Sequence, residues 1–541
     1  MTSKFSLVRD PWIVVRTLDH RVEEVSLSTL FDHASQYRGL GGELPTQEVA
    51  ILRLLLAILA RATAARRSHD DSMELWQEWW SSRTLPGDSI RKYLAQHEER
   101  FDLFDPTHPF MQVPGLGTAS GSTSGLVKLI AEVPDGQKFF SLRLGPGLTS
   151  VSPAEAARWL VHAQSFDTSG IKTGVLGDDR VKGGRTYPLG TSYTGSLGVV
   201  LAEGTNLLET LLLNLCVDRV SVSDSVPWER DPDSAGPNPT HVAPGGFSDL
   251  FTWQSRRIRL IQEGGAVTDA VITYGDVLRP ENLQHLETMA AFKLSDNLTR
   301  REKRDIFWPV RHNPDRSMWR GLNSWAAAGP GSTHVETPHI MSWLAGLREA
   351  DAITDESVSI RTVGIEYGSQ SATVARVIDD AMTGHVSAFT SQAVLAAAID
   401  AAVLADELAR SYANLIRQLQ RAAGSGDAQP AGPYAAALYA AFDPEFRDWF
   451  SMLRVDGHLS EFNIQWQKRA RRLALAEGRK SVQQAGPGAI RGQMRDDVPS
   501  FVSRFGILDA ASILRAFERD VALKTPLANA SPPRQEVPQD A

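Results

Sequence analysis

Residues 391–423 read SQAVLAAAIDAAVLADELARSYANLIRQLQRAA, and this stretch decides the fold of the C-terminal part of the chain. Alanine, leucine and isoleucine recur in it every three or four residues, which is the spacing of one apolar helix face. Gly424 follows directly, and glycine readily takes the left-handed backbone that ends helices. The sequence therefore predicts one long helix that needs partners to cover its apolar face.

Helical patterns continue beyond this helix, in residues 433–442, 444–475 and 507–523. Four helical stretches with fairly short connections are typical of a helical bundle. We therefore predict a C-terminal four-helix bundle over residues 385–524. The Pro-rich, polar residues 525–541 are expected to form a disordered tail.

The part before the bundle, residues 1–384, mixes strand-like and helical patterns. Residues 12–15 form a short β-branched run that predicts a strand, whereas residues 48–67 have helical composition. A glycine-rich stretch over 165–198 is too long for an ordinary connection and is typical of a functional or a disordered loop. The fold class predicted for all 541 residues is α+β, a large mixed α/β N-terminal domain followed by the bundle.

Charge and cysteine content narrow the classes of function. The chain has 56 Lys and Arg against 64 Asp and Glu, a net charge of −8, so any nucleic-acid contact must be made by local basic groups. Cys216 is the one cysteine, which excludes an intrachain disulfide and a multi-cysteine zinc site and is typical of a small buried hydrophobe. The apolar run 49–60 is too short to span a membrane and predicts a core helix. No signal peptide is recognisable, and we expect a cytoplasmic protein without membrane contact.

Motifs of known catalytic sites are missing from the sequence. It contains no phosphate-binding loop, no nucleophile elbow and no His-Glu-x-x-His helix. His69 and Asp70 form an adjacent pair of the kind used by metal-dependent phosphohydrolases and nucleases, which is the alternative function, but their polar surroundings are more typical of a solvated turn. His334, Glu336 and His339 fit no standard metal motif. We therefore predict no catalytic residue, no metal and no cofactor.

Basic residues cluster in three places: at Arg256, Arg257 and Arg259 in a strand-like run, near residue 303, and near residue 470. Lys and Arg grouped in this way can neutralise phosphates without reading sequence, although a solvated face is an equally good interpretation of any one cluster alone. The residues predicted to contact the DNA backbone are Lys303, Arg304, Lys468, Arg471 and Arg472.

Four segments of the chain resemble, in the same order, the large subunit of the type I-E CRISPR Cascade complex, the CasA family. They are DPWIVV at 10–15, FDLFD at 101–105, HPFMQ at 108–112 and WPVRHNPD at 308–315. The resemblance implies a non-catalytic subunit that partners the other Cascade subunits, the guide RNA, double-stranded target DNA and a recruited helicase-nuclease. It would recognise the protospacer-adjacent motif from the minor groove and help to start strand separation. A scaffold that never touches DNA is a further alternative.

The resemblance also implies roles for individual residues. Gly183 and Gly184 match a glycine loop, where the lack of side chains lets the backbone approach base edges closely. Gln370, with Ser369 beside it, matches a wedge that partly unstacks a base step. Lys293 is the first choice for a lysine finger, with Lys303 as the alternative. The loop that reaches toward the guide RNA and a neighbouring subunit would begin at Phe166, Asp167 and Thr168.

Overall fold

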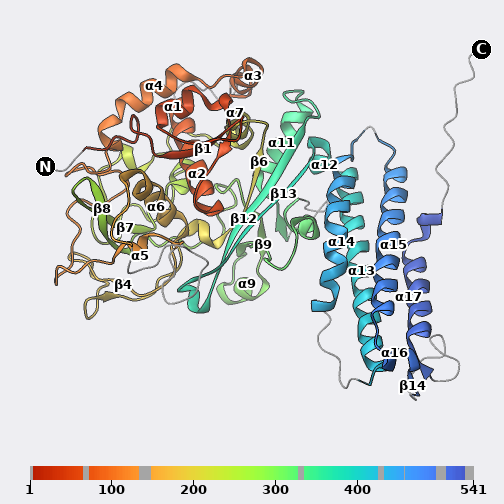
Figure 1. Cartoon of the computed structure of the whole chain (residues 1–541). Helices are drawn as coiled ribbons and strands as arrows, with labels where there is room; N and C mark the ends of the chain where they lie inside the picture. The colour runs from red at the N-terminus through yellow and green to blue at the C-terminus, as the bar shows by residue number, and fades with distance from the viewer. Residues whose placement is uncertain are drawn as a thin grey trace, which may run out of the picture. The chain divides into compact units, whose positions relative to one another are not determined.

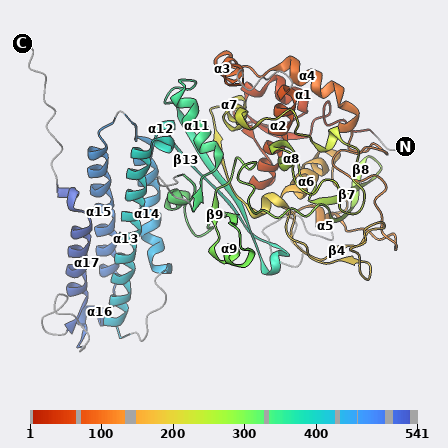
Figure 2. The ribbon, with the colours of Figure 1, turned by 180° about the vertical axis from the view of Figure 1, so that it is seen from behind.

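The structure is a computed structural model that describes residues 4–64, 72–132, 148–326, 334–424, 432–455, 457–494 and 507–529. These residues form two compact units. The first takes the described residues within 1–315, 328–352 and 358–381, and the second takes those within 316–327, 353–357 and 382–541. Figures 1 and 2 show the elements of both from opposite sides.

The first unit is built on helices of mixed length. Its central helix α2 is buried almost all round, and α6 and α8 pack against it, which confirms that the apolar run 49–60 is a core helix. Its helices are α1 (Leu27–Asp32), α2 (Pro45–Ala64), α3 (Ser72–Ser82), α4 (Gly87–Gln96), α5 (Leu126–Leu129), α6 (Pro153–Phe166), α7 (Leu207–Asn214), α8 (Phe247–Phe251), α9 (Asp296–Glu302) and α11 (His339–Glu349).

Short antiparallel sheets surround these helices. The strand orders are β2-β1-β3, β10-β9-β11, β13-β12-β6, β4-β5 and β7-β8. The strand predicted at 12–15 is confirmed as β1. The strands are β1 (Ile13–Thr17), β2 (Val22–Val25), β3 (Tyr37–Leu40), β4 (Lys172–Thr173), β5 (Arg185–Thr186), β6 (Gly198–Glu203), β7 (Arg256–Glu263), β8 (Ala266–Tyr274), β9 (Phe292–Leu294), β10 (Phe307–Pro309), β11 (Val335–Glu336), β12 (Ser357–Tyr367) and β13 (Val374–His385).

The two longest strands, β12 and β13, form the long hairpin labelled in Figure 1. β12 is the central strand of its sheet and pairs with β6 in antiparallel register, with Ile360 opposite Ala202 and Val363 opposite Val199. This pairing holds β12 in the sheet. Residues 368–373 form the loop that joins β12 to β13 at the end of the hairpin.

The second unit contains the predicted four-helix bundle. Among its described residues, α13 (Gln392–Ala422), α14 (Gly432–Ser451), α15 (Leu459–Gln483) and α17 (Ala510–Lys524) run side by side in both views. The shorter elements of this unit are α10 (Leu322–Trp325), α12 (Val386–Thr390), α16 (Pro487–Arg491), β14 (Gln493–Met494) and β15 (Ile507–Leu508). The mixed N-terminal part and the C-terminal bundle confirm the predicted fold class.

One boundary inside the bundle was predicted wrongly. The sequence placed a helix end at Phe442 and a new helix over 444–475, but α14 runs through Pro444 to Ser451. Phe446 and Trp449 bury their rings against Trp466, which holds the helix together across the proline. The break falls later, before Leu459. Among the described residues, no helix has both the length and the apolar character needed to cross a membrane.

A buried ion pair ties α2 to the connection between β8 and β9. The guanidinium of Arg53 donates to both carboxylate oxygens of Glu287 at 3.0 and 2.9 Å, and both side chains are fully buried. The same guanidinium lies over the ring of Phe251, 3.7 Å from its centroid. A buried charge that loses its partner is costly, so this pair constrains how α2 packs.

Replacing Arg53 with methionine should lower the free energy of unfolding by about 3–5 kcal/mol, because Glu287 is left as an unpaired buried charge. Denaturant-induced unfolding followed by circular dichroism measures this. The double variant Arg53→Met, Glu287→Leu should recover much of the loss. Arg21→Ala, which removes an arginine that is 70% exposed, is the control and should leave the midpoint unchanged. A single variant as stable as the parent would show that the pair does not constrain the core.

Candidate nucleic-acid interface

The loop between β12 and β13 presents the two residues expected to act as the wedge. Ser369 and Gln370 are exposed, and Gln370 has left-handed backbone angles, φ 54° and ψ 20°. Ser371 also has a positive φ of 55°. Such angles in residues other than glycine cost about 1–3 kcal/mol each and persist only where surrounding contacts impose them. Among the described residues, the amide of Gln370 makes no hydrogen bond and is open to solvent.

The tip is closed by its own backbone hydrogen bonds, among them Ser371 N–H to the carbonyl of Gly368 at 2.9 Å, and it is also contacted by residues 166–174, here called the bracing segment. The backbone N–H of Ser169 donates to the carbonyl of Ser371 at 2.7 Å, and the phenol of Tyr367 donates to the carbonyl of Phe166 at 2.7 Å. Burial raises the pKa of Tyr367 well above its usual value, so the phenol keeps the proton that it donates. The structure therefore brings two predicted site segments together.

The bracing segment is held in turn by a buried ionic cluster. The carboxylate of Asp167 is 2.6 Å from Nζ of Lys172 and 2.5 Å from Nε of Arg256, and all three side chains are buried. Burial alone would raise the pKa of Asp167, but the two cations outweigh it and hold that pKa below 3.8. Arg256, on β7, also donates to the carbonyls of Thr168 and Gly190, at 3.0 Å each.

Gly183 and Gly184 lie in the turn of the β4–β5 hairpin, whose first strand is the end of the bracing segment. Their φ values are 59° and 72°, in the left-handed region that favours glycine, and a Cβ on either would have open space around it. The turn thus exposes bare backbone. The bracing segment carries this glycine turn through β4 and contacts the hairpin tip through Ser169.

The lysines expected to reach DNA lie in the β10-β9-β11 sheet and at the end of α9, not on the β12–β13 hairpin. Lys293 is exposed in β9, opposite Trp308 of β10 and Val335 of β11. Lys303 ends α9 with left-handed angles, φ 56° and ψ 31°, and is also exposed. Arg304 is paired with Glu281 at 2.6 Å. Both lysines are therefore exposed to solvent.

Two of the three residues predicted to reach the guide RNA are buried. Phe166 is the last residue of α6, and its fully buried ring stacks on His162 with 5.4 Å between centroids. Burial lowers the pKa of His162 to about 4, so this ring is neutral and part of the core. Asp167 belongs to the ionic cluster, which leaves Thr168 as the one side chain of the three that is half open to solvent.

The C-terminal basic cluster lies on α15, where acidic residues of α14 neutralise part of it. Arg472 is 2.8 Å from Glu445, and Arg469 is 2.5 Å from Asp448. Arg471 donates to the side chain of Asn529 at 2.8 Å. Lys468 is exposed and makes no ion pair within the described part of the chain.

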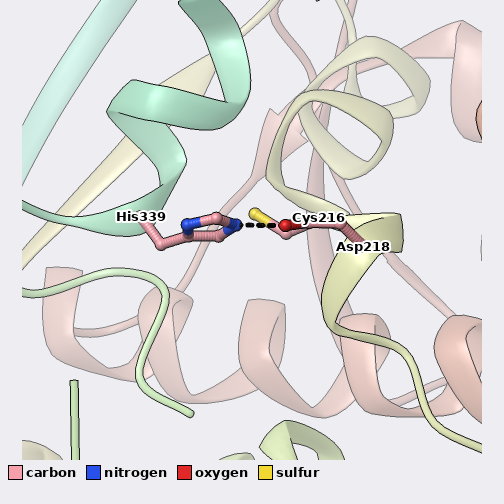
Figure 3. A group of neighbouring side chains, drawn as sticks. All are labelled: Cys216, Asp218 and His339. Carbon is pink, nitrogen blue, oxygen red and sulfur yellow. Dashed lines mark hydrogen bonds and ion pairs between the residues drawn. The ribbon is translucent and has the colours of Figure 1, made fainter. Parts of the chain in front are cut away.

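Among the described residues, the histidines considered as metal ligands in the sequence are not brought together. His69 and Asp70 lie outside the described residues. His339 is at the start of α11, where its neighbours among the described side chains that could bind a metal are Cys216 and Asp218, not His334 or Glu336. Figure 3 shows these three side chains turned toward one another. Cys216 is buried, as predicted, and burial raises the pKa of its thiol.

Residues 6–476 match the family model described as CRISPR-associated protein Cse1. The chain belongs to the Cse1 family. A crystal structure of Thermobifida fusca Cse1 is 35% identical, with a TM-score of 0.88 over 97% of this chain and 99% of that one. The CasA/Cse1 protein of Thermus thermophilus is 29% identical over 70% of this chain and 69% of its own length. A chain of a CRISPR RNA-guided surveillance complex, 18% identical, shares the fold with a TM-score of 0.70 over 97% of this chain and 100% of that one.

Membership of the Cse1 family confirms the resemblance to CasA that the four sequence segments indicated. Sequence reasoning missed Ser169, Tyr367 and Arg256 as residues that shape the candidate site. Arg256 was noticeable only as part of a basic run, and its burial gives it an internal role. Ser169 and Tyr367 carry no local signal, because each acts on a segment some 200 residues away along the chain.

Replacing Asp167 with asparagine should loosen the bracing segment, because Lys172 and Arg256 are left as two buried like charges. We expect a loss of about 3–5 kcal/mol in the free energy of unfolding. Hydrogen exchange should also become faster in residues 166–174 and 368–373. The matched control is Asp315→Asn, which removes an exposed carboxylate paired with Arg376 and should change neither measurement.

The difference in the free energy of unfolding between the parent and Asp167→Asn depends on pH, because the pKa of Asp167 is lowered in the folded chain. The carboxylate stabilises the folded chain above its ordinary pKa of 3.8, and that contribution is lost as pH falls below this value. The gap in stability between the parent and Asp167→Asn should therefore narrow in acid. Unchanged exchange at 368–373 in the variant would contradict the bracing role.

Proposed function

We propose that this chain is the large, non-catalytic subunit of an RNA-guided CRISPR surveillance complex, and that it reads the protospacer-adjacent motif of duplex DNA. Its partners are the other Cascade subunits, the guide RNA, the double-stranded target and a recruited helicase-nuclease. Membership of the Cse1 family supports the assignment to the complex. In this proposal DNA reading needs no cofactor, and the chain works in the cytoplasm.

The observation that carries the DNA-reading role is the braced tip at Ser369 and Gln370. Minor-groove readout needs groups held in place before the DNA arrives, because mobile groups would lose conformational entropy on binding. The tip meets this need through the hydrogen bonds from Ser169 and Tyr367. Its exposed amide can enter beside a base step, and partial unstacking there costs a few kcal/mol that new contacts offset.

The glycine turn supplies the second contact with the groove. Gly183 and Gly184 present backbone groups without side chains, and the minor groove is only about 6 Å wide. Groove readout distinguishes mainly A·T from G·C pairs, so recognition of the motif is permissive. Lys293 or Lys303 adds a cation near the phosphates or base edges. In a chain of net charge −8 such local cations carry the attraction.

The role in contacting the guide RNA stays a prediction for Phe166, Asp167 and Thr168. The burial of the first two side chains gives them the task of positioning the loop, and Thr168 is the side chain that can reach a partner. A surface scaffold without DNA contact is the outcome that the following experiments distinguish.

Gln370→Ala should slow strand opening at a target while the assembled complex forms normally, because the wedge is lost and the brace is kept. Permanganate footprinting of unpaired thymines in the assembled complex measures opening, and native mass spectrometry measures assembly. The matched control is Gln483→Ala, which truncates an exposed glutamine at the end of α15. Equal opening by the variant and the parent would remove Gln370 from the mechanism.

The basic cluster on α15 is tested through salt dependence. Lys468→Ala with Arg471→Ala should weaken binding to duplexes of any sequence. It should also flatten the slope of log affinity against log salt by about 0.9 for each phosphate that is no longer neutralised, or roughly 1.8 in total. Arg9→Ala with Arg21→Ala removes two exposed charges elsewhere and is the control. A slope equal to that of the parent would show that α15 lies outside the DNA interface.

A further inference from the structure

Three side chains with different metal-binding atoms meet in the first unit, away from the hairpin tip. Cys216 follows α7, Asp218 lies two residues later in a single 3-10 turn, and His339 begins α11. Their potential ligand atoms all lie within 4.8 Å of one another, and Nε2 of His339 is 2.7 Å from Oδ2 of Asp218. Figure 3 shows the sulfur, the imidazole and the carboxylate converging on one point.

The chemistry of this set suits zinc. Thiolate, imidazole and carboxylate are the ligands that Zn²⁺ takes in proteins, and sites with three protein ligands complete a tetrahedron with water. Ligand atoms around one zinc ion are about 3.3–3.6 Å apart, given metal–ligand bonds of about 2.0–2.3 Å. The His339–Asp218 pair, now 2.7 Å apart, therefore has to open by about 0.6 Å, and the widest pair of the cluster, at up to 4.8 Å, has to close by roughly 1 Å. Both changes are of a size that side-chain rotation can supply.

The cluster is open to solvent on one side, and packed helices hold the segments that carry its residues. Cys216 is buried, whereas the side chains of Asp218 and His339 are 43% and 17% exposed, so solvent reaches the cluster from their side. α11 packs against α7, which fixes the distance between the two segments that carry the ligands.

We propose that Cys216, Asp218 and His339 bind one Zn²⁺ ion, with water as the fourth ligand. The thiol releases its proton to solvent when the bond to sulfur forms. The hydrogen bond from Nε2 of His339 to Asp218 is replaced by their bonds to the ion, so Nε2 gives up its proton and the imidazole takes the tautomer protonated at Nδ1. The ion cross-links residues that are more than 120 positions apart in sequence and so stabilises the contact between α7 and α11.

Arg219 opposes the ion in the metal-free chain and provides the sharpest test. Its Nε and Nη2 atoms lie 3.3 Å from the two ring nitrogens of His339, and Nη1 donates to the carbonyl of His285. A guanidinium at this position repels a divalent cation and occupies its approach. The side chain is 37% exposed, so it can swing into solvent when the ion binds.

Titration with Co²⁺ in place of Zn²⁺ tests the proposal on the full chain. Cys216 is the one cysteine of the sequence, so a thiolate-to-cobalt charge-transfer band in the near ultraviolet reports this residue alone. We expect the band to saturate at one Co²⁺ per chain and to disappear when Zn²⁺ displaces the cobalt. Zn²⁺ should also raise the melting temperature, because the ion binds the folded chain.

Single substitutions distinguish metal binding at this cluster from metal binding elsewhere on the chain. Cys216→Ser should abolish the band, and His339→Ala should weaken Co²⁺ binding by about tenfold or more, since even outer-shell changes cost that much. Asp218→Asn, at an exposed position that cannot unfold the core, should weaken it as well. Arg219→Ala should tighten binding by removing the competing charge. His33→Ala, an exposed histidine outside the cluster, is the matched control and should change nothing.

Two results would overturn the proposal. The first is the absence of a near-ultraviolet band in the parent chain under Co²⁺ saturation. The second is equal Co²⁺ affinity in the parent, Asp218→Asn and His339→Ala, which would place the metal elsewhere. Unchanged or weaker binding by Arg219→Ala would contradict the competition between the guanidinium and the ion. These measurements need neither DNA nor other subunits, so they are independent of the proposed DNA-reading role.

Discussion

The carboxylate of Asp167 lies between the buried cations of Lys172 and Arg256, and the geometry of the candidate interface depends on this contact. It fixes the start of the bracing segment against β7. That segment then supplies Ser169 to the hairpin tip and forms the first strand of the hairpin with the glycine turn. Removing the anion would leave two unpaired positive charges in the interior, so the cluster favours one arrangement of the segment over its alternatives.

Local periodicity explains how much of the fold the sequence could predict. The apolar spacing in residues 391–423 indicated a long helix, and α13 occupies nearly the same residues. The proline at 444 misled because a proline is a local signal, whereas the packing of Phe446 and Trp449 that keeps α14 continuous is tertiary. Prediction of the candidate site was limited in the same way, because local sequence signals do not reveal tertiary contacts. Glycine and glutamine positions followed from family resemblance, but their brace comes from pairings between distant segments that no periodicity encodes.

The number of arginines in the sequence overestimates how many arginine side chains are free to contact nucleic acid. Arg53, Arg256 and Arg257 are buried and paired with acidic groups, so they contribute to the interior. On α15, Arg469 and Arg472 pair with residues of α14. Exposed cations remain on α9 and α15 and at Lys293, and several of them pair with neighbouring carboxylates. In a chain of net charge −8, any contact with nucleic acid therefore depends on local groups of exposed cations and not on the net charge.

The hydrogen bonds that hold the tip have a further consequence for the proposed reading and opening of DNA. Gln370 has left-handed backbone angles, and the segment that leads into the hairpin of Gly183 and Gly184 supplies one of the hydrogen bonds that hold the tip, from Ser169 to Ser371. In the proposed function, a groove that displaces the glycine turn would therefore also shift the hairpin tip, because residues 166–174 connect the two by covalent and hydrogen bonds. Motif reading and wedge insertion would then depend on each other through one short segment.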